Sequence, residues 1–180
     1  MKLDDRQKIA LSNIVAAMLF SFSYILIGAL YFPFRLPPVE TLTERFLFAS
    51  QCILFAGLPL ACGLVAVLTR KLMRPNTLDG EPVLDGSRLD IHIRFVRDTG
   101  PHLLLFSIGL LNIAVYLVGA FASFLPVITS WFIFARGFYW VAYLFNPAHR
   151  IFGSVATMSP TLFMFFWCAM KILGNASATH

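Results

Sequence analysis

Two arginines and two tyrosines share one face of an apolar segment in the last third of the chain. Arg136 is the only charged residue in the segment 126–145, and Tyr139, Tyr143 and Arg150 follow it at offsets of 3, 7 and 14. At about 100° per residue these offsets fall within roughly 60° of one helix face. Guanidinium groups bind carboxylates through paired hydrogen bonds, and a cationic pocket lowers the pKa of a thiol. This face is predicted to form the wall of a cationic site for a small acidic, thiol-bearing or amphiphilic ligand.

The composition of the chain indicates a membrane protein. The 180 residues are 58% hydrophobic and 13% charged, with a mean hydropathy of +0.76, whereas soluble domains carry about 25% charged residues. A charge at bilayer depth costs at least ~2.5–3.5 kcal/mol, so Arg136 is expected to lie inside a helix bundle or a wet cavity. The net charge of +5 is attributed to membrane topology and anionic headgroups rather than to nucleic-acid binding.

Runs without Asp, Glu, Lys or Arg predict an all-α integral membrane fold with five spans. The runs are 9–34, 46–69, 99–135, with a break predicted at 124–126, then about 127–145 across Arg136, and 151–170. The run 99–135 is too long for one span of ~20 residues, which is why it is divided. The first span is interpreted as a retained anchor, because its distal end lacks the small residues of a signal-peptide cleavage site.

The distribution of Lys and Arg predicts the orientation. With the N-terminus in the cytosol, ten of the 14 Lys and Arg residues lie in cytosolic segments and three on the far side, and Arg136 is intramembrane. This bias predicts a lumenal or extracellular C-terminus, with the Asn175 sequon on that side. The three cysteines are interpreted as packing residues, and the histidines form no metal-binding pattern, so no metal site is predicted.

Local signals predict how the helices begin and bend. Ser87, with Asp90 three residues on, is expected to cap the third spanning helix on the cytosolic side, after a turn-like segment that begins at residue 74. Pro101 is expected to kink or restart that helix, because it lacks a backbone N–H. In the second span, Gly57, Pro59 and Gly63 predict a kink or a close approach of helices.

The segment "FARGFYWVAYLFNPAHRIFG", residues 134–153, resembles a known family. It looks like the junction between the third and fourth helices of the MAPEG family, the membrane-associated proteins in eicosanoid and glutathione metabolism. Members of the leukotriene C4 synthase type have Arg, Tyr, Tyr and Arg at matching spacing. The resemblance implies that Arg136, Tyr139 and Tyr143 contact glutathione, and that Arg150 activates its thiol if the protein is an enzyme.

A second segment, "RFVRDTGPHLLLF", residues 94–106, resembles the second-helix motif of the same family. Arg94 matches the motif arginine, and Arg70 is a looser match to a basic residue that ends the family's first helix. Asp98 replaces the motif asparagine, and Pro101 replaces the glutamate that holds the amino group of glutathione. The resemblance therefore implies a degenerate glutathione site, in which Asp98 either takes over the amino contact or repels the carboxylates of glutathione.

The resemblance covers about residues 44–173 and implies a four-helix MAPEG-like domain. Residues 1–43 add a cytosolic N-terminus, one extra spanning helix and a lumenal loop, and 174–180 form a lumenal tail. An extra helix before such a domain is similar to the transmembrane protein 79 (mattrin) group, which is associated with trans-Golgi, lysosomal and secretory-granule membranes. The family also implies a homotrimer with the ligand between subunits.

Three interpretations of the polar residues stay open. In the first, Arg136 only packs the bundle, paired with Asp98 or with a backbone carbonyl. In the second, the protein is a non-catalytic or trafficking protein of secretory membranes that keeps a lipid, amphiphilic or thiol ligand. In the third, it is a glutathione-dependent transferase or peroxidase in which Arg150 lowers the pKa of the glutathione thiol. The first two share the expectation that the chain is not an enzyme.

Overall fold

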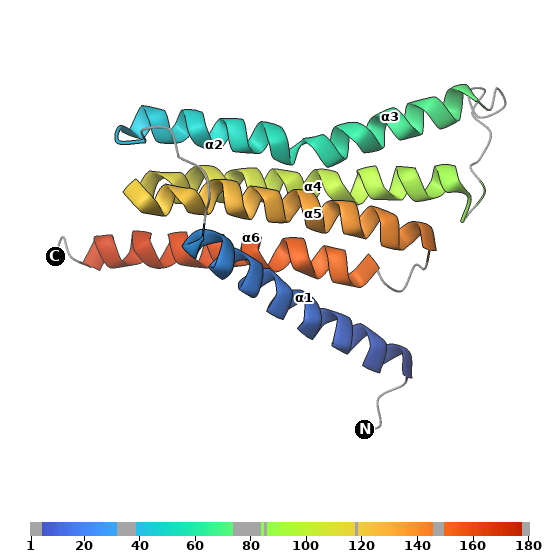
Figure 1. The fold of residues 1–180 in the computed structure, drawn as a ribbon, viewed down its shortest axis with the longest axis horizontal. Coiled ribbons are helices and arrows are strands. Elements are labelled where there is room, and N and C mark those ends of the chain that lie inside the picture. Colours follow the sequence, from blue (N-terminus) through green and yellow to red (C-terminus); the bar gives the residue numbers. More distant parts are fainter. Residues whose placement is uncertain are drawn as a thin grey trace.

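The computed structural model describes residues 5–31, 39–73, 84, 86–117, 119–145 and 150–177, and every regular element in these ranges is helical (Figure 1). The turn-like segment expected from residue 74 and the side chain of Asn175 fall outside the described part. The elements are α1 (Asp5–Leu30), α2 (Leu42–Ala56), α3 (Leu58–Leu72), α4 (Arg88–Tyr116), the 3-10 helix η2 (Gly119–Ser123), α5 (Phe124–Phe145) and α6 (Arg150–Ser177).

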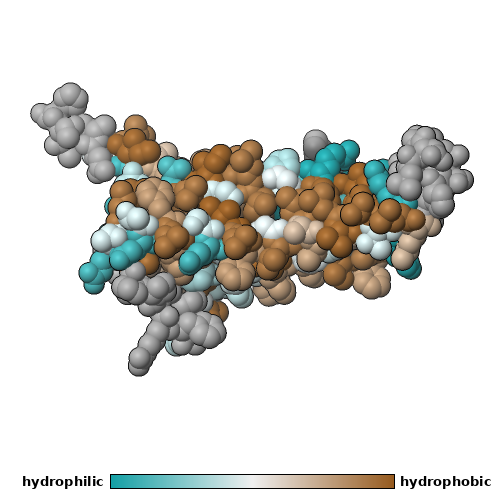
Figure 2. Space-filling model, turned by 90° about the horizontal axis from the view of Figure 1, so that it is seen from above, coloured by the Kyte–Doolittle hydropathy of each residue, from teal (hydrophilic) through white to brown (hydrophobic). Residues whose placement is uncertain are grey.

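Five segments are long and apolar enough to cross a membrane, which confirms the predicted all-α, five-span class. They are Gln7–Leu30, Leu42–Leu72, Arg88–Tyr116, Phe121–Phe145 and Arg150–Gly174. Hydrophobic residues dominate the middle of the molecule and hydrophilic patches lie toward its two ends (Figure 2). Helices α4, α5 and α6 lie side by side, with α2 and α3 along one side and α1 crossing obliquely over α6 (Figure 1).

The second span consists of two helices that meet at Gly57. A capping box at Thr41 and Glu44 starts α2, since each residue's side chain accepts the other's backbone N–H. Gly57 ends α2, and Pro59 falls in the first turn of α3, where its missing N–H costs no helical hydrogen bond. At Gly63 a Cβ would lie 2.8 Å from the Phe95 ring, so a glycine is needed for α3 to approach α4 this closely. These observations confirm the predicted kink and close approach.

Helix α4 begins as predicted but ends earlier than expected. Ser87 caps it by accepting the backbone N–H of Asp90 at 3.2 Å. The helix then runs through Pro101 without interruption, so the alternative that it restarts there is wrong. It ends at Tyr116, and the short helix η2 separates it from α5, so the break precedes the predicted position at 124–126. Pro126 instead lies in the first turn of α5, where proline is tolerated.

A proline inside α6 ties three helices together. Pro160 has no N–H, so the carbonyl of Ala156, four residues earlier, has no helical donor. Trp131 of α5 donates its indole N–H to this oxygen at 2.8 Å. The Ser21 hydroxyl of α1 lies 3.3 Å from the same oxygen, but it donates its one proton mainly to the Ala17 carbonyl at 2.6 Å. A backbone carbonyl without a donor is costly in the bilayer, and neighbouring helices usually supply one. The hydrogen bond from Trp131 therefore fixes α5 against α6, and α1 packs closely at the same point.

Candidate functional site

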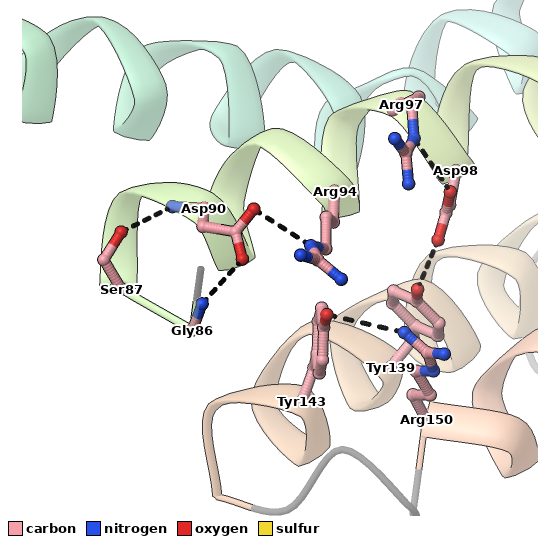
Figure 3. Close-up of polar contacts among 9 residues, drawn as sticks. All are labelled: Gly86, Ser87, Asp90, Arg94, Arg97, Asp98, Tyr139, Tyr143 and Arg150. Carbon is pink, nitrogen blue, oxygen red and sulfur yellow. Dashed lines mark hydrogen bonds and ion pairs between the residues drawn. The ribbon is translucent and has the colours of Figure 1, made fainter. Parts of the chain in front are cut away.

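A cleft lies at the end of the bundle where α4 begins, α5 ends and α6 begins. It encloses about 630 Å³ and is called the basic-end cleft here. Three of the predicted site residues meet in it, namely Arg94, Tyr143 and Arg150 (Figure 3). Its described lining consists of Gly86, Asp90, Ile91, Arg94, Tyr143, Leu144, Phe145 and Arg150. The cleft thus combines two guanidinium groups, one phenol and one carboxylate with an apolar portion, and is suited to a small anionic or amphiphilic molecule.

Asp90 holds Arg94 at the entrance of α4. The Nε of Arg94 lies 2.9 Å from Oδ1 of Asp90, one helical turn away, and the Gly86 N–H donates to Oδ2 at 2.9 Å. One carboxylate therefore ties the first turns of α4 to the side chain that lines the cleft. Asp90 also partly neutralises the cleft, because it brings a negative charge beside the arginine. Its spacing from Arg94 was the available signal, but the sequence prediction used Asp90 only as part of the cap.

Arg150 is the first residue of α6 and is exposed to the cleft. Its guanidinium carbon lies 5.3 Å from the centre of the Tyr143 ring, and its Nη1 donates to the Tyr143 hydroxyl over a long 3.4 Å. Tyr143 comes from the last turn of α5, so the two residues meet because α5 ends where α6 begins. Among the described residues neither side chain makes another hydrogen bond, so most of the donors of Arg150 and the hydroxyl proton of Tyr143 remain for a ligand.

Asp98 does not line the cleft. One of its oxygens accepts the Tyr139 hydroxyl at 2.7 Å, and the other lies 3.7 Å from Nε of Arg97 (Figure 3). Tyr139 itself is buried, with 1% of its surface exposed, and its ring packs against Phe95. Two predicted ligand contacts, Asp98 and Tyr139, are therefore paired with each other between α4 and α5.

Arg136 is the most buried charged residue of the described chain, with 0% of its surface exposed. One Nη donates to the hydroxyl of Thr157 on α6, and the guanidinium lies 5.9 Å from the Phe132 ring centre and 5.4 Å from that of Tyr139. Its Nε and other Nη have no hydrogen-bond partner among the described residues. The expected partner, Asp98 or a backbone carbonyl, is thus replaced by a threonine hydroxyl. Thr157 was missed; its only sequence signal is its place one turn after Gly153 in α6.

Arg70 lies apart from these residues. It is exposed in the last turn of α3 and is not among the residues that line the cleft. Trp140 donates its indole N–H to Nδ1 of His92 at 2.9 Å, and His92 is not among the described residues that line the cleft. Within the described residues, His, Cys, Asp and Glu form no group of three or more able to hold a metal ion.

Comparisons with known proteins give two curated relatives. The chain is 30% identical over 163 residues to transmembrane protein 79 of Mus musculus, which covers 88% of this chain and 40% of that protein. It is 29% identical over 158 residues to transmembrane protein 79 of Bos taurus, covering 85% of this chain and 38% of that protein. No family model and no solved structure matches the chain.

These matches support the predicted similarity to the transmembrane protein 79 group. The chain spans about two fifths of the length of the curated relatives it matches. Together with the five apolar helices, they define an integral, multi-pass membrane protein. The similarity to the MAPEG family stays a prediction.

Proposed function

We propose that this protein is a non-catalytic, multi-pass protein of endomembranes that binds a small anionic or amphiphilic ligand in the basic-end cleft. The observation that carries the proposal is the meeting of Arg94, Tyr143 and Arg150 around one cavity of about 630 Å³. Two guanidinium groups from different helices match a carboxylate or phosphate group, and the apolar portion of the lining accommodates a hydrocarbon part. A degenerate, MAPEG-like glutathione site is the form of this proposal that the sequence resemblance favours.

Some of the predicted site residues lie inside the bundle and others line the cleft, and this division supports ligand binding without catalysis. Tyr139 and Asp98 are paired with each other, and Arg136 is fully buried against Thr157, so none of the three lies in the described lining of the cleft to hold a peptide there. Asp90 is the carboxylate that lines the cleft, and it is the group placed to receive a ligand's ammonium. The lost family glutamate is therefore replaced, in this proposal, by Asp90 rather than by Asp98.

The second candidate is a glutathione-dependent transferase or peroxidase. The exposed Arg150 beside the Tyr143 hydroxyl favours it, because a guanidinium next to a bound thiol stabilises the thiolate. The thiolate would then attack a lipophilic electrophile that enters from the bilayer. The thiolate absorbance of protein-bound glutathione near neutral pH separates the two candidates, because only this one requires it.

The proposal includes the membrane arrangement and the assembly expected from the sequence. The N-terminus is placed in the cytosol, the C-terminus in the lumen, and the protein in Golgi or lysosomal membranes as a homotrimer. The basic-end cleft then faces the cytosol, where glutathione and anionic lipid headgroups are both available. Native mass spectrometry of the purified protein measures the stoichiometry, and a species other than a trimer contradicts that part.

Glutathione binding to the purified full chain, measured by isothermal titration, tests the proposed function. We expect micromolar to low-millimolar binding that is lost in Arg150→Ala and Arg94→Ala. Lys171→Ala is the charge-matched control, because Lys171 lies near the opposite end of α6 and packs on Trp167. Arg70→Ala reports whether a neighbouring copy completes the cleft, since within one chain Arg70 does not line it. Equal binding by all variants contradicts the cleft as the site.

Vesicles that contain an anionic phospholipid test the amphiphilic form of the ligand. If the headgroup is the ligand, the anionic vesicles compete with glutathione, and neutral phosphatidylcholine vesicles do not. Absence of binding to both, by a protein that is still folded, contradicts the proposed function.

A further inference from the structure

A second cavity, of about 620 Å³, lies between α1 and the α5–α6 pair. It is called the aromatic groove here. Its lining consists of Phe20, Ser23, Tyr24 and Ile27 of α1, Trp131, Phe134 and Phe138 of α5, and Phe152 of α6. All three helices belong to membrane-spanning segments, and none of the described lining residues is charged. The groove therefore opens toward lipid, and its occupant is a molecule that resides in the bilayer.

Aromatic contacts bound the groove at both ends. At one end the Tyr24 and Trp131 rings lie 4.9 Å apart, and Trp131 lies 5.5 Å from Phe134. At the other end Phe152 contacts Phe138 at 4.9 Å and Phe20 at 6.2 Å, both edge to face. Trp131 and Phe138 are seven residues apart on α5, which corresponds to about 10 Å along the helix.

The groove is formed before any ligand arrives. The Trp131 indole is fixed by its hydrogen bond to the Ala156 carbonyl that Pro160 leaves without a helical donor. The Ser21 hydroxyl of α1 lies 3.3 Å from the same oxygen while it donates to the Ala17 carbonyl at 2.6 Å, so the helix that forms the opposite wall packs closely at the same point. A preformed apolar surface favours a rigid ligand, because a rigid body loses little conformational entropy on binding, whereas a flexible acyl chain loses more.

One end of the groove carries an acceptor for a single hydroxyl. The Ser130 hydroxyl donates to the Val127 carbonyl at 2.8 Å, so it acts as the acceptor in its 3.0 Å contact with the Tyr24 hydroxyl. Tyr24 then donates to Ser130, and its phenolic oxygen keeps a lone pair for another donor. A ligand hydroxyl supplies that donor, whereas a phosphate group supplies acceptors and a charge that no described lining residue neutralises.

We propose that the aromatic groove binds a sterol-class lipid, a rigid, planar and uncharged molecule with one hydroxyl. The hydroxyl donates to the Tyr24 oxygen, and the fused rings lie along α5 from Trp131 toward Phe138. The exposed rings of Phe20 and Phe134, which are 63% and 56% accessible, cover the faces of the sterol. This site is separate from the basic-end cleft, since the two share no lining residue.

The test uses Trp131 as a reporter in the full chain. The sequence contains three tryptophans, and Trp140 and Trp167 do not line the groove, so Trp140→Phe/Trp167→Phe leaves a single emitter inside it. The protein is reconstituted in phosphatidylcholine vesicles, and its emission is titrated with a brominated sterol or with a phosphatidylcholine brominated on its acyl chains. Bromine quenches only at short range. Circular dichroism and thermal unfolding establish that the reporter protein is folded.

We expect half-maximal quenching by the brominated sterol at a mole fraction about tenfold lower than by the brominated phospholipid. Unlabelled cholesterol should reverse the quenching of Trp131 emission by the brominated sterol. Tyr24→Phe keeps the ring and removes the acceptor, so it should reduce the sterol preference several-fold. Tyr31→Phe is the matched control, because it also removes one phenolic hydroxyl from a tyrosine that does not line the groove.

Three results overturn the proposal. Equal quenching by both brominated lipids means that the groove holds only the lipid that surrounds the protein. Absence of quenching by either, in a folded protein, means that a protein surface covers it. An equal effect of the Tyr24 and Tyr31 substitutions contradicts the assigned hydroxyl contact.

Discussion

Arg136 and Arg150 are fourteen residues apart on the same predicted helix face, and the structure gives them different surroundings. Arg136 is fully buried between α5 and α6, held by the Thr157 hydroxyl and by two aromatic rings. Arg150 begins a new helix and lies exposed beside Tyr143 in the basic-end cleft. The comparison teaches that residue type and spacing do not separate a buried arginine from one that is exposed in a cleft. The difference arises because α5 ends at Phe145 and a new helix begins at Arg150.

Of the predicted substitutions, those of Arg136 should change the stability most. Arg136→Ala removes a large side chain from the middle of the bundle and leaves a void, so the free energy of unfolding should fall by about 3–5 kcal/mol. Arg136→Met fills the void without a charge and without the two guanidinium nitrogens that have no partner among the described residues. We expect its stability to equal or exceed that of the wild type. Thermal unfolding in detergent measures both.

Arg150→Ala provides the control for that experiment. Because Arg150 is exposed, its loss should change the stability by less than about 0.5 kcal/mol while it removes ligand binding. If Arg136→Met is as unstable as Arg136→Ala, the charge itself stabilises the bundle, and the structural account of Arg136 given above is wrong.

The close approach of α5 and α6 should give the next largest effect. A Cβ at Gly153 would lie 2.5 Å from the Cβ of Tyr139 and 2.9 Å from the Ala135 carbonyl oxygen. Gly153→Ala should therefore force the helices apart and lower the stability by about 1–3 kcal/mol. Gly137→Ala is the same change on α5 with no atom within 4 Å of the new Cβ, and it should not destabilise. Equal unfolding temperatures for the two variants would contradict the tight contact.

The smallest predicted difference in stability is the one between Tyr139→Phe and Tyr143→Phe. Tyr139→Phe leaves the Asp98 oxygen without its 2.7 Å donor, so the stability should fall by about 1 kcal/mol. Tyr143→Phe loses only the long 3.4 Å contact with Arg150, so the stability should barely change while ligand affinity falls. Unfolding and titration on the same preparations separate the two roles. A larger stability loss in Tyr143→Phe than in Tyr139→Phe would reverse the assignment.

Local features of the structure followed predictably from the sequence. Ser87 caps α4, and the break at Gly57 follows from residues whose backbone chemistry acts within one turn. The start of α5 at Phe124 was not predicted, because the break had been expected at 124–126. The continuation of α4 through Pro101 was not predictable. A proline removes one hydrogen bond, and the surrounding helices decide whether the chain bends or continues.

Contacts between side chains on different helices were not revealed by the spacing of residues in the sequence. Asp98 contacts Tyr139, Thr157 contacts Arg136, and Trp131 contacts the Ala156 carbonyl, over separations of 41, 21 and 25 residues. Each pair lies on two different helices, so it depends on the rotation and depth of both. A single helical period fixes which residues share a face, but not which neighbour that face meets.

The sequence by itself determined the membrane class, the five spans and the α5 face that Arg136, Tyr139 and Tyr143 share, because hydropathy and helical period are properties of each segment alone. The predicted extension of that face to Arg150 was wrong, because α5 ends at Phe145 and Arg150 begins α6. Only the tertiary structure decided that Thr157 is the partner of Arg136 and that Arg150 lies open, that Asp90 rather than Asp98 lines the cleft, and that α1 forms a groove with α5. These depend on contacts such as the one at Gly153, where the absence of a side chain sets how closely two helices approach and hence which side chains meet.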